Sequence, residues 1–275
     1  MPEGDTVWNT AQVLERALAG RELTASDFRV PQLATARLDG WTVVESACRG
    51  KHLLLRMATP AGEKRTLHSH LRMEGAWRAY DKGQRWAARP SHLIRVILRT
   101  TGPVAVGYHL HELKIIRTAD EHTLVGHLGP DLLKPDWDPD EAVRRLSAKP
   151  DATIAEALLD QRNLAGIGNL YKAETLFLRG VWPWTRVGDL AKPELDGMVD
   201  LAHRLLNANT GRWTQSTTGS LRRFETSYVY GRRAQPCRRC GTAIEKKDLG
   251  ERVTYWCPRC QKAPDKPKPE PQPEP

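Results

Sequence analysis

The chain lacks any long hydrophobic run. Its 275 residues contain no stretch of about eighteen or more apolar residues, the length that a membrane-spanning helix needs. The first twenty residues also lack the basic head and apolar core of a secretory signal. These absences exclude the integral-membrane and secreted classes, and we expect a soluble, intracellular protein of the cytoplasm.

Cysteine is scarce and unevenly distributed, with only five residues. Four form two CxxC pairs, Cys237/Cys240 and Cys257/Cys260, with sixteen residues between the pairs. This spacing is typical of a tetrahedral structural zinc site rather than of a disulfide framework. We predict one Zn²⁺ ion held by four thiolates, which leaves no open position for catalysis. The remaining Cys48 is interpreted as a half-buried thiol in a strand.

Positive charge is in excess, and it is concentrated near the cysteines. The net charge is +9, and residues 222–262 carry eleven basic and four acidic side chains. Such a concentration on a small module is typical of nucleic-acid binding, because neutralising phosphates releases counterions. We therefore expect DNA or RNA as a partner. A solvated basic face without a ligand is the alternative.

The first part of the chain reads as one helix followed by strands. Residues 5–19 have apolar side chains at helical spacing, with Asp5 or Thr6 as a cap and Gly20 at the end. Runs with β character follow at 41–47, 51–57, 66–71, 75–80, 92–100 and 103–110. Alternation within the run 92–100 puts Ile97 on the side opposite to Ile94. Short strands at this spacing predict a sandwich or barrel.

The hydrophobic period then becomes helical. Four helices are predicted at 139–148, 153–161, 169–180 and 192–208, with Asp, Thr or Asn near their starts. The boundary between the two parts lies near residues 120–135. A third unit surrounds the cysteines, and the proline-rich tail 263–275 has no core-forming residue, so we expect it to be disordered.

The opening MPEG raises a chemical question, because removal of Met1 makes Pro2 the N-terminal residue. An α-amino group with a pKa of about 7.7–8.0 is about one-tenth neutral at pH 7, whereas lysine, at about 10.4, is almost wholly protonated. A Schiff base forms from the neutral amine, so Pro2 is the better nucleophile. Alternatively, Pro2 merely follows the initiator Met and does no chemistry.

Four motifs occur in order: MPEG, RGK at 49–51, LAGIGNLY at 164–171, and YGR…CRRCG…ERVTYWCPRCQ at 230–261. Together they resemble the formamidopyrimidine-DNA glycosylase and endonuclease VIII family of base-excision repair enzymes. The resemblance implies an α+β multidomain fold with DNA bound in a cleft. Its parts are a catalytic N-terminal helix and β-sandwich in 1–120, a helix–two-turn–helix domain in 121–225 and a zinc-finger hairpin in 226–262.

The resemblance also implies the reaction and its residues. Pro2 would attack C1′ of the damaged nucleotide, and Glu3 would transfer protons to the sugar and the base. Lys51 would contact phosphate and help elimination, although a lysine at a strand start is otherwise often just solvated. Arg252, between the cysteine pairs, would contact the phosphate flanking the lesion and assist δ-elimination. No cofactor beyond zinc is implied, and we expect a monomer acting on damaged chromosomal DNA in the nucleoid.

Four further residues are interpreted as DNA contacts. In LAGIGNLY, Gly166 and Gly168 allow a tight turn, and Asn169 caps the following helix while facing a phosphate. In SHLRMEGAW, the resemblance makes Met73 the side chain that fills the space left by the flipped base, with Arg72 contacting the opposite strand or a phosphate. Met73 could equally be a core residue. His127 aligns loosely with a DNA-contacting arginine of endonuclease VIII.

The chain departs from the family where proline and glutamate often follow the opening, because it has Asp5 and Thr6. An auxiliary proton shuttle is therefore absent or shifted to Asp5. Gly4 and the short segment from Thr217 to YVYGR favour endonuclease VIII and hence oxidised pyrimidines, whereas LRMEG resembles the 8-oxoguanine branch.

Two readings from other classes remain. A non-catalytic zinc-ribbon DNA-binding protein would explain the cysteines and the charge without using Pro2. A tautomerase also uses an N-terminal proline, as a general base, but such chains are small oligomeric subunits without zinc modules. A catalytically inactive member of the family is a third alternative, suggested by Asp5 and Thr6.

Overall fold

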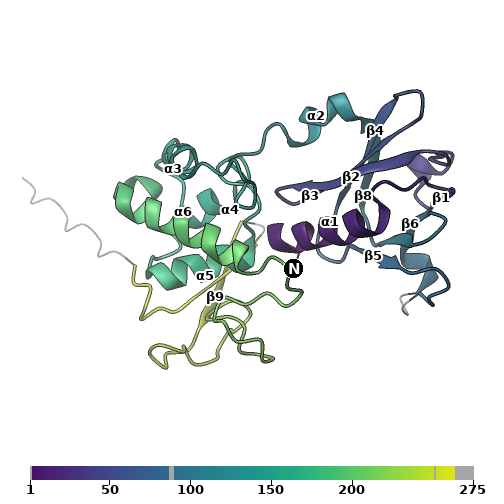
Figure 1. Cartoon of the computed structure of the whole chain (residues 1–275). Helices are drawn as coiled ribbons and strands as arrows, with labels where there is room; N and C mark the ends of the chain where they lie inside the picture. Colours follow the sequence, from purple (N-terminus) through teal and green to yellow (C-terminus); the bar gives the residue numbers. More distant parts are fainter. Residues whose placement is uncertain (1, 87–89, 251, 264–275) are drawn as a thin grey trace, which may run out of the picture.

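The computed structural model describes residues 2–86, 90–250 and 252–263. The predicted removal of Met1 and, apart from Ala263, the predicted disordered tail lie outside the described residues. Within those ranges, no helix has both the length and the apolar character needed to cross a bilayer. Figure 1 shows one half built mainly from strands and one built mainly from helices, with the N-terminus between them.

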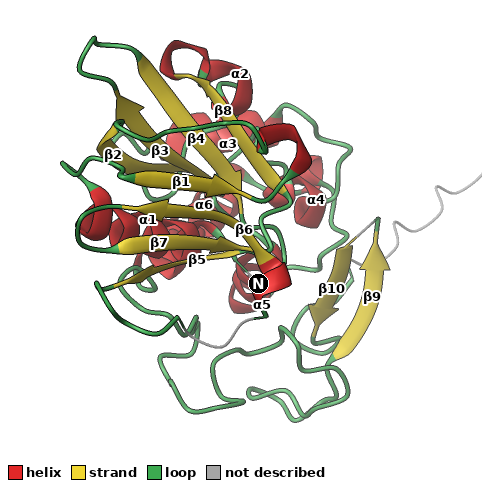
Figure 2. Cartoon of the chain, turned by 90° about the vertical axis from the view of Figure 1, so that its right-hand side faces the viewer, coloured by secondary structure: helices red, strands yellow, loops and turns green. Residues whose placement is uncertain are grey.

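The strand-rich half is a β-sandwich flanked by one helix, as predicted. Its elements are α1 (Gly4–Leu18), β1 (Ala25–Phe28), β2 (Thr42–Arg49), β3 (His52–Ala58), β4 (Lys64–His70), β5 (Ala76–Tyr80), β6 (Ile94–Arg99), β7 (Val104–Tyr108) and β8 (Glu112–Arg117). Two antiparallel sheets, in the orders β1-β6-β7-β5 and β2-β3-β4-β8, form the layers (Figure 2). Helix α1 contacts strands of both sheets and buries its apolar stripe in the core between them.

The predicted helix and all six predicted strands are confirmed, but β1 and β8 were missed. Strand β1 has only four residues, and β8 lies at a sheet edge with mostly half-exposed side chains, so neither has a clear alternation. The placement of Ile97 on the side opposite to Ile94 is wrong, because the register shifts between Ile94 and Val96. Both isoleucines are buried in a second small apolar cluster with Tyr80 and Tyr108.

The second half is helical. It contains α2 (His122–Val125), α3 (Pro139–Ser147), α4 (Ile154–Leu159), α5 (Asn169–Arg179) and α6 (Lys192–Asn207). Short 3₁₀ turns lie at Pro31–Leu33 and Ser91–Leu93 in the strand-rich half, at Thr118–Asp120 directly after β8, and at Val187–Asp189 between α5 and α6. The four predicted helices are α3 to α6. Asp138 caps α3, and Thr153 forms a capping box with Glu156 at α4, as their side chains allow. Helix α5 instead begins after Gly168, which has no side chain to cap it, and the group that caps it belongs to the site described below.

The cysteine-rich segment forms a two-stranded hairpin, as expected for the crossover between two CxxC pairs. Strands β9 (Glu245–Leu249) and β10 (Arg252–Trp256) pair antiparallel. Strand β10 contacts helix α5, and an apolar cluster that includes Phe177 and Val229 joins the cysteines to that helix. The hairpin is therefore fixed to the helical half rather than standing apart from it.

The two halves meet at the N-terminus. The backbone N–H of Gly4 donates to the Gly166 carbonyl at 2.8 Å, and a Cβ on Gly4 would lie only 2.9 Å from the Gly166 Cα. Further along α1, the Asn9 side chain donates to the Arg212 carbonyl and accepts from Gly211 N–H. Only glycine at position 4 permits this approach, so the start of the chain is clamped against the turn before α5.

Candidate active site and zinc centre

A cavity of about 300 Å³ lies where the two halves meet. Six of the predicted site residues line it: Pro2, Lys51, Arg72, Met73, Asn169 and Arg252. They come from the N-terminus, the start of β3, the β4–β5 turn, the start of α5 and the zinc hairpin. The fold therefore gathers residues that are up to 250 positions apart in the sequence around one cavity.

Glu3 lies directly behind this cavity and caps helix α5. Its carboxylate is fully buried and accepts the backbone N–H of Gly168 and of Leu170, each at 2.7 Å. A Cβ on Gly168 would lie 2.5 Å from the Glu3 carboxyl carbon, so a glycine is needed there. The interpretation of Asn169 as the cap is wrong: Gly168 holds the N-cap position, and a side chain from the other half supplies the acceptor.

Burial shifts the pKa values of the two ionisable groups on either side of Pro2 in opposite senses. Loss of hydration raises the pKa of Glu3, although Lys51 and the α5 N–H groups oppose the rise. Loss of hydration likewise lowers the pKa of Lys51, opposed by the charge of Glu3. Both changes favour the uncharged forms. A carboxyl that can hold a proton and an amine that can release one thus lie near Pro2.

Asp5 serves neither as a helix cap nor as a cavity residue. Its buried carboxylate accepts the Tyr171 hydroxyl at 2.9 Å and the Gln215 side-chain amide at 2.9 Å. The Asp5 or Thr6 cap predicted for α1 is therefore wrong, since Glu3 holds the N-cap position without a capping side-chain bond. Asp5 joins α1 to α5 and to the segment after α6, a role that the sequence did not signal.

Helix α5 also holds the zinc hairpin in place. The Asn169 side chain donates to the Val253 carbonyl at 2.8 Å, and the Lys172 ammonium donates to the Thr254 hydroxyl at 2.8 Å. Asn169 Oδ1 is buried and has no hydrogen-bond partner among the described residues. Burial lowers the pKa of Lys172 to about 8. These contacts keep the β10 backbone, and with it Arg252, at the edge of the cavity.

The β4–β5 turn presents Met73 to solvent. Met73 is 58% exposed, so the alternative that it is a core residue is wrong. The Gly75 N–H closes the turn on the Leu71 carbonyl at 2.8 Å, and a Cβ on Gly75 would lie 2.4 Å from the same oxygen. Arg72 has a left-handed backbone, with φ of 51°. The turn is therefore tight, and its tip side chain projects beside Pro2.

A row of histidines next to the cavity was not predicted. His70 lines the cavity, and its Nδ1 accepts the backbone N–H of Arg72 at 3.0 Å. Behind it, His52 Nδ1 lies 2.9 Å from His68 Nε2, with the two rings stacked. Burial lowers the pKa of His52 to about 3, and those of His68 and His70 to about 4. His127 is exposed near His52 and does not line the cavity.

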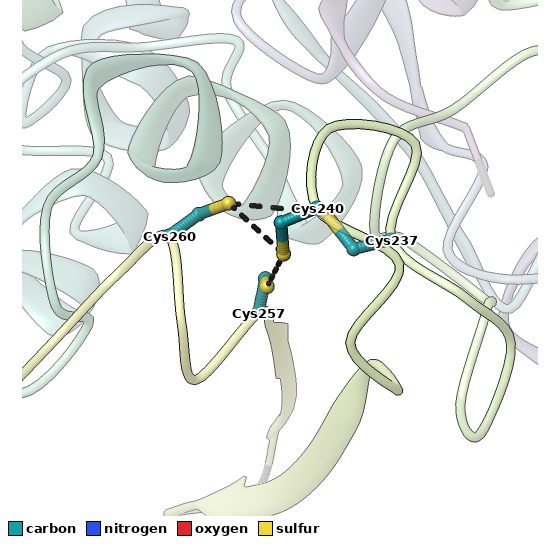
Figure 3. Close-up of side chains that lie close together, drawn as sticks. All are labelled: Cys237, Cys240, Cys257 and Cys260. Atoms are coloured by element: carbon teal, nitrogen blue, oxygen red, sulfur yellow. Dashed lines mark hydrogen bonds between the residues drawn. The ribbon is translucent and has the colours of Figure 1, made fainter.

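The four cysteines of the two CxxC pairs converge at one point (Figure 3). All four sulfurs lie within 4.8 Å of one another, and the measured pairs are separated by 3.5 to 3.9 Å. A zinc ion with Zn–S bonds of about 2.3 Å in a tetrahedron needs sulfurs about 3.8 Å apart. The residues therefore fit one structural zinc, as predicted. Cys48, by contrast, lies buried in β2, where burial raises the pKa of its thiol to about 12.

Comparison with known proteins agrees with this architecture. Residues 1–110 match the formamidopyrimidine-DNA glycosylase N-terminal domain, residues 128–218 the H2TH domain of the same enzymes, and residues 234–263 a zinc finger found in FPG and IleRS. A solved complex between the Lactococcus lactis Fpg and abasic-site DNA has the same fold, with a TM-score of 0.78 at 24% identity over 95% of this chain and 100% of that one.

Two curated relatives are similar over nearly their whole length. The chain is 54% identical to a probable endonuclease 8 2 of Streptomyces coelicolor, with 96% of this chain and 95% of the relative covered. It is 46% identical to the DNA-(apurinic or apyrimidinic site) lyase Nei2 of Mycolicibacterium smegmatis, with 96% and 100% covered. The chain therefore belongs to the family of formamidopyrimidine-DNA glycosylases and endonuclease 8 enzymes.

Proposed function

We propose that the protein is a bifunctional DNA glycosylase and AP lyase that removes oxidised pyrimidines and cleaves the strand by β,δ-elimination. One observation carries the proposal. Pro2 lines a cavity together with Lys51 and Arg252, and the fully buried Glu3 carboxyl lies behind it. This combination provides an amine nucleophile, a proton donor, and two hydrogen-bond donors for phosphate, of which Arg252 is a cation, at one place. The relatives named endonuclease 8 and AP lyase support the same activity.

The first step uses the N-terminal amine. With Met1 removed, the neutral Pro2 nitrogen attacks C1′, and the N-glycosidic bond breaks with its electron pair leaving on the base. Glu3 supplies a proton during this step, since burial raises its pKa and so keeps more of the carboxyl protonated near neutral pH. The departing base is thereby neutralised, and the attacking nitrogen loses its own proton. The C1′–O4′ bond then opens, with O4′ taking up a proton, and the nitrogen lone pair forms an iminium that joins Pro2 to the opened sugar.

Strand cleavage follows from the iminium, which withdraws electrons from the sugar. Loss of a proton from C2′ expels the 3′ phosphate, and a second elimination expels the 5′ phosphate, leaving a one-nucleotide gap with phosphate ends. We assign Lys51 and Arg252 to the phosphates, because both line the Pro2 cavity and the head group of each donates hydrogen bonds that phosphate oxygens accept. The structural zinc supplies no chemistry here; it holds the hairpin that carries Arg252.

DNA binding is assigned to the same face. Asn169 and His127 are proposed as backbone contacts, and Met73 as the side chain that occupies the space left by the flipped nucleotide, with Arg72 beside it. The exposure of Met73 at the tip of a tight turn supports that role. We propose that the protein acts as a monomer on chromosomal DNA within the nucleoid, since every group assigned here comes from a single chain.

The substrate branch is proposed from the sequence and from the relatives. Gly4, the short segment between Thr217 and Tyr230, and the endonuclease 8 relatives favour oxidised pyrimidines such as thymine glycol or dihydrouracil. The LRMEG motif favours 8-oxoguanine or formamidopyrimidine, which is the alternative substrate within the same family.

Borohydride trapping tests the proposal. Mature protein is incubated with duplex oligonucleotides carrying a thymine glycol, an 8-oxoguanine or an abasic site, and the reduced adduct is mapped by mass spectrometry. We expect an adduct on Pro2, with a higher yield from thymine glycol than from 8-oxoguanine. A variant with one extra residue ahead of Pro2 is the control, because it should bind DNA but form no adduct. If mature protein binds DNA yet traps none of the three, it is a non-catalytic zinc-ribbon binder.

A further inference from the structure

The turn that carries Met73 runs beside a second turn at the same end of the sandwich. The β4–β5 turn, residues 71–75, leaves β4 and enters the other sheet, and the β7–β8 turn, residues 109–111, makes the return crossing. Because β4 pairs with β8 and β5 pairs with β7, the two crossings are forced to be neighbours. In particular, His70, the last residue of β4, faces Glu112, the first of β8.

Two side-chain contacts join these turns, one on each side of Met73. The Arg72 guanidinium forms an ion pair with the Glu112 carboxylate. On the other side, His109 Nδ1 lies 3.0 Å from Glu74 Oε2, which is within ion-pair distance but without hydrogen-bond geometry. His109 is itself fixed, since its backbone N–H donates to the Leu93 carbonyl at 2.9 Å.

Met73 thus lies between two residues held from outside the turn. Arg72 is held twice, by Glu112 at its side chain and by His70 at its backbone N–H. Its left-handed backbone, with φ of 51°, carries a conformational cost for a non-glycine residue, so contacts from neighbours are needed to maintain it. The exposed Met73 has no such restraint and projects toward the cavity that contains Pro2.

We propose that Glu112 and His109 are positioning residues that brace the β4–β5 turn, so that Met73 and Arg72 enter a DNA duplex in one fixed geometry. This proposal rests on the proposed glycosylase function. Glu112 orients the Arg72 guanidinium beside the space that the flipped nucleotide leaves, and His109 fixes the other side of the turn through Glu74. Pre-ordering the turn before DNA arrives reduces the entropy lost when the flipped state forms.

The brace matters only where a base stack must be held open. In a duplex substrate, flipping the target nucleotide leaves an orphan base, the unpaired base on the opposite strand, and a space between the stacked neighbours. Keeping the nucleotide flipped costs a few kcal/mol, which an inserted side chain offsets. A single-stranded abasic oligonucleotide has no orphan base and needs no insertion. The ratio of duplex to single-strand activity therefore isolates the brace from the chemistry at Pro2 and from general stability.

The test compares Glu112→Gln with wild type on a thymine glycol duplex and on a single-stranded abasic oligonucleotide, under single-turnover conditions. The control Glu63→Gln removes a similar ion pair, with Arg65 at 2.7 Å, whose residues do not line the Pro2 cavity. His109→Gln is a second, independent variant. We expect each brace variant to lose about three- to tenfold in the single-turnover rate constant on the duplex, the range expected from loss of one partly exposed ion pair and of order in the turn. Single-strand cleavage should stay within about twofold.

Equal activity of both brace variants and wild type on the duplex would overturn the brace. A parallel loss on duplex and single strand would also overturn it, because that pattern indicates a damaged fold or active site. Wild-type protein that cleaves neither substrate would instead refute the underlying glycosylase function. Wild-type cleavage of single-stranded DNA with a duplex-selective loss in the variants supports both. An orphan 2-aminopurine opposite the lesion gives an independent reading: its fluorescence rise on binding should be smaller in Glu112→Gln.

Discussion

Replacing Gly168 by alanine puts a methyl group where the Glu3 carboxyl lies. The new Cβ would be 2.5 Å from the carboxyl carbon, so Glu3 must retreat by about 1 Å to reach ordinary contact distance. The hydrogen bonds from Gly168 and Leu170 N–H, each 2.7 Å now, would then be stretched past useful length. The N–H groups at the start of α5 would lose the Glu3 carboxyl as their hydrogen-bond acceptor, and that buried carboxyl would lose the two N–H donors.

The size of the effect follows from those two bonds. Each hydrogen bond to this buried carboxyl is worth about 1–3 kcal/mol net, so loss of the two should lower the free energy of unfolding of Gly168→Ala by about 2–6 kcal/mol. Displacing a general acid typically costs about 100-fold or more in rate, so base excision should fall by at least that factor. Cleavage of a pre-formed abasic site should fall less, because no base has to be protonated there.

Urea unfolding and single-turnover excision measure these losses on one preparation. Gly102→Ala is the matched control, because the nearest atom to its new Cβ would be the end of the flexible Arg21 side chain, 3.6 Å away. If Gly168→Ala unfolds at the wild-type urea concentration and excises thymine glycol at the wild-type rate, then Glu3 neither caps α5 nor depends on that cap.

Three other perturbations have defined outcomes. Removing zinc with a chelator, or replacing Cys257 by Ser, should release the hairpin and reduce δ-elimination more than β-elimination, as a gel assay of the 3′ ends will report; retention of both products would contradict the role of the hairpin. Arg252→Ala should reproduce that selective loss with the zinc content unchanged by atomic absorption. The pKa of His68 is about 4 when folded and higher when unfolded, so the unfolded chain binds more protons below about pH 6.5 and stability falls as pH drops toward 4. His68→Gln should remove up to about 2 kcal/mol of that fall between pH 7 and 5 in urea unfolding, and an unchanged pH dependence would refute it.

The elements with strong local signals were predictable. Helix α1, six strands, four helices and the cysteine hairpin all follow from periodicity, turn residues and the CxxC spacing. The failures share a physical cause. Strands β1 and β8 have weak patterns because tertiary pairing stabilises them. Ile97 lies in the same small cluster as Ile94, because a register shift after Ile94 breaks the alternation. Local pattern cannot report on which face a distant segment packs.

The candidate site was predictable in its residue types but not in its contacts. Pro2, Lys51 and Arg252 stood out by chemistry or by family motif, and all three line one cavity. The sequence suggested a helix cap for Asn169 because asparagine is a common cap, yet the acceptor is Glu3 from the other half. A cap supplied across 165 positions has no local signature.

The sequence by itself determined the zinc site, the layered architecture and a proline at position 2, which suits Schiff-base chemistry when Met1 is removed, because ligand spacing, hydrophobic period and amine basicity are local properties. Tertiary structure alone decided how these parts cooperate. Gly166 and Gly168 leave room for the close approach of Gly4 and Glu3, and Asp5 joins α1 to α5. The two turns that cross between the sheets lie side by side, so that Glu112 reaches Arg72. Those contacts depend on the close approach of segments far apart in the chain, which only the folded packing fixes.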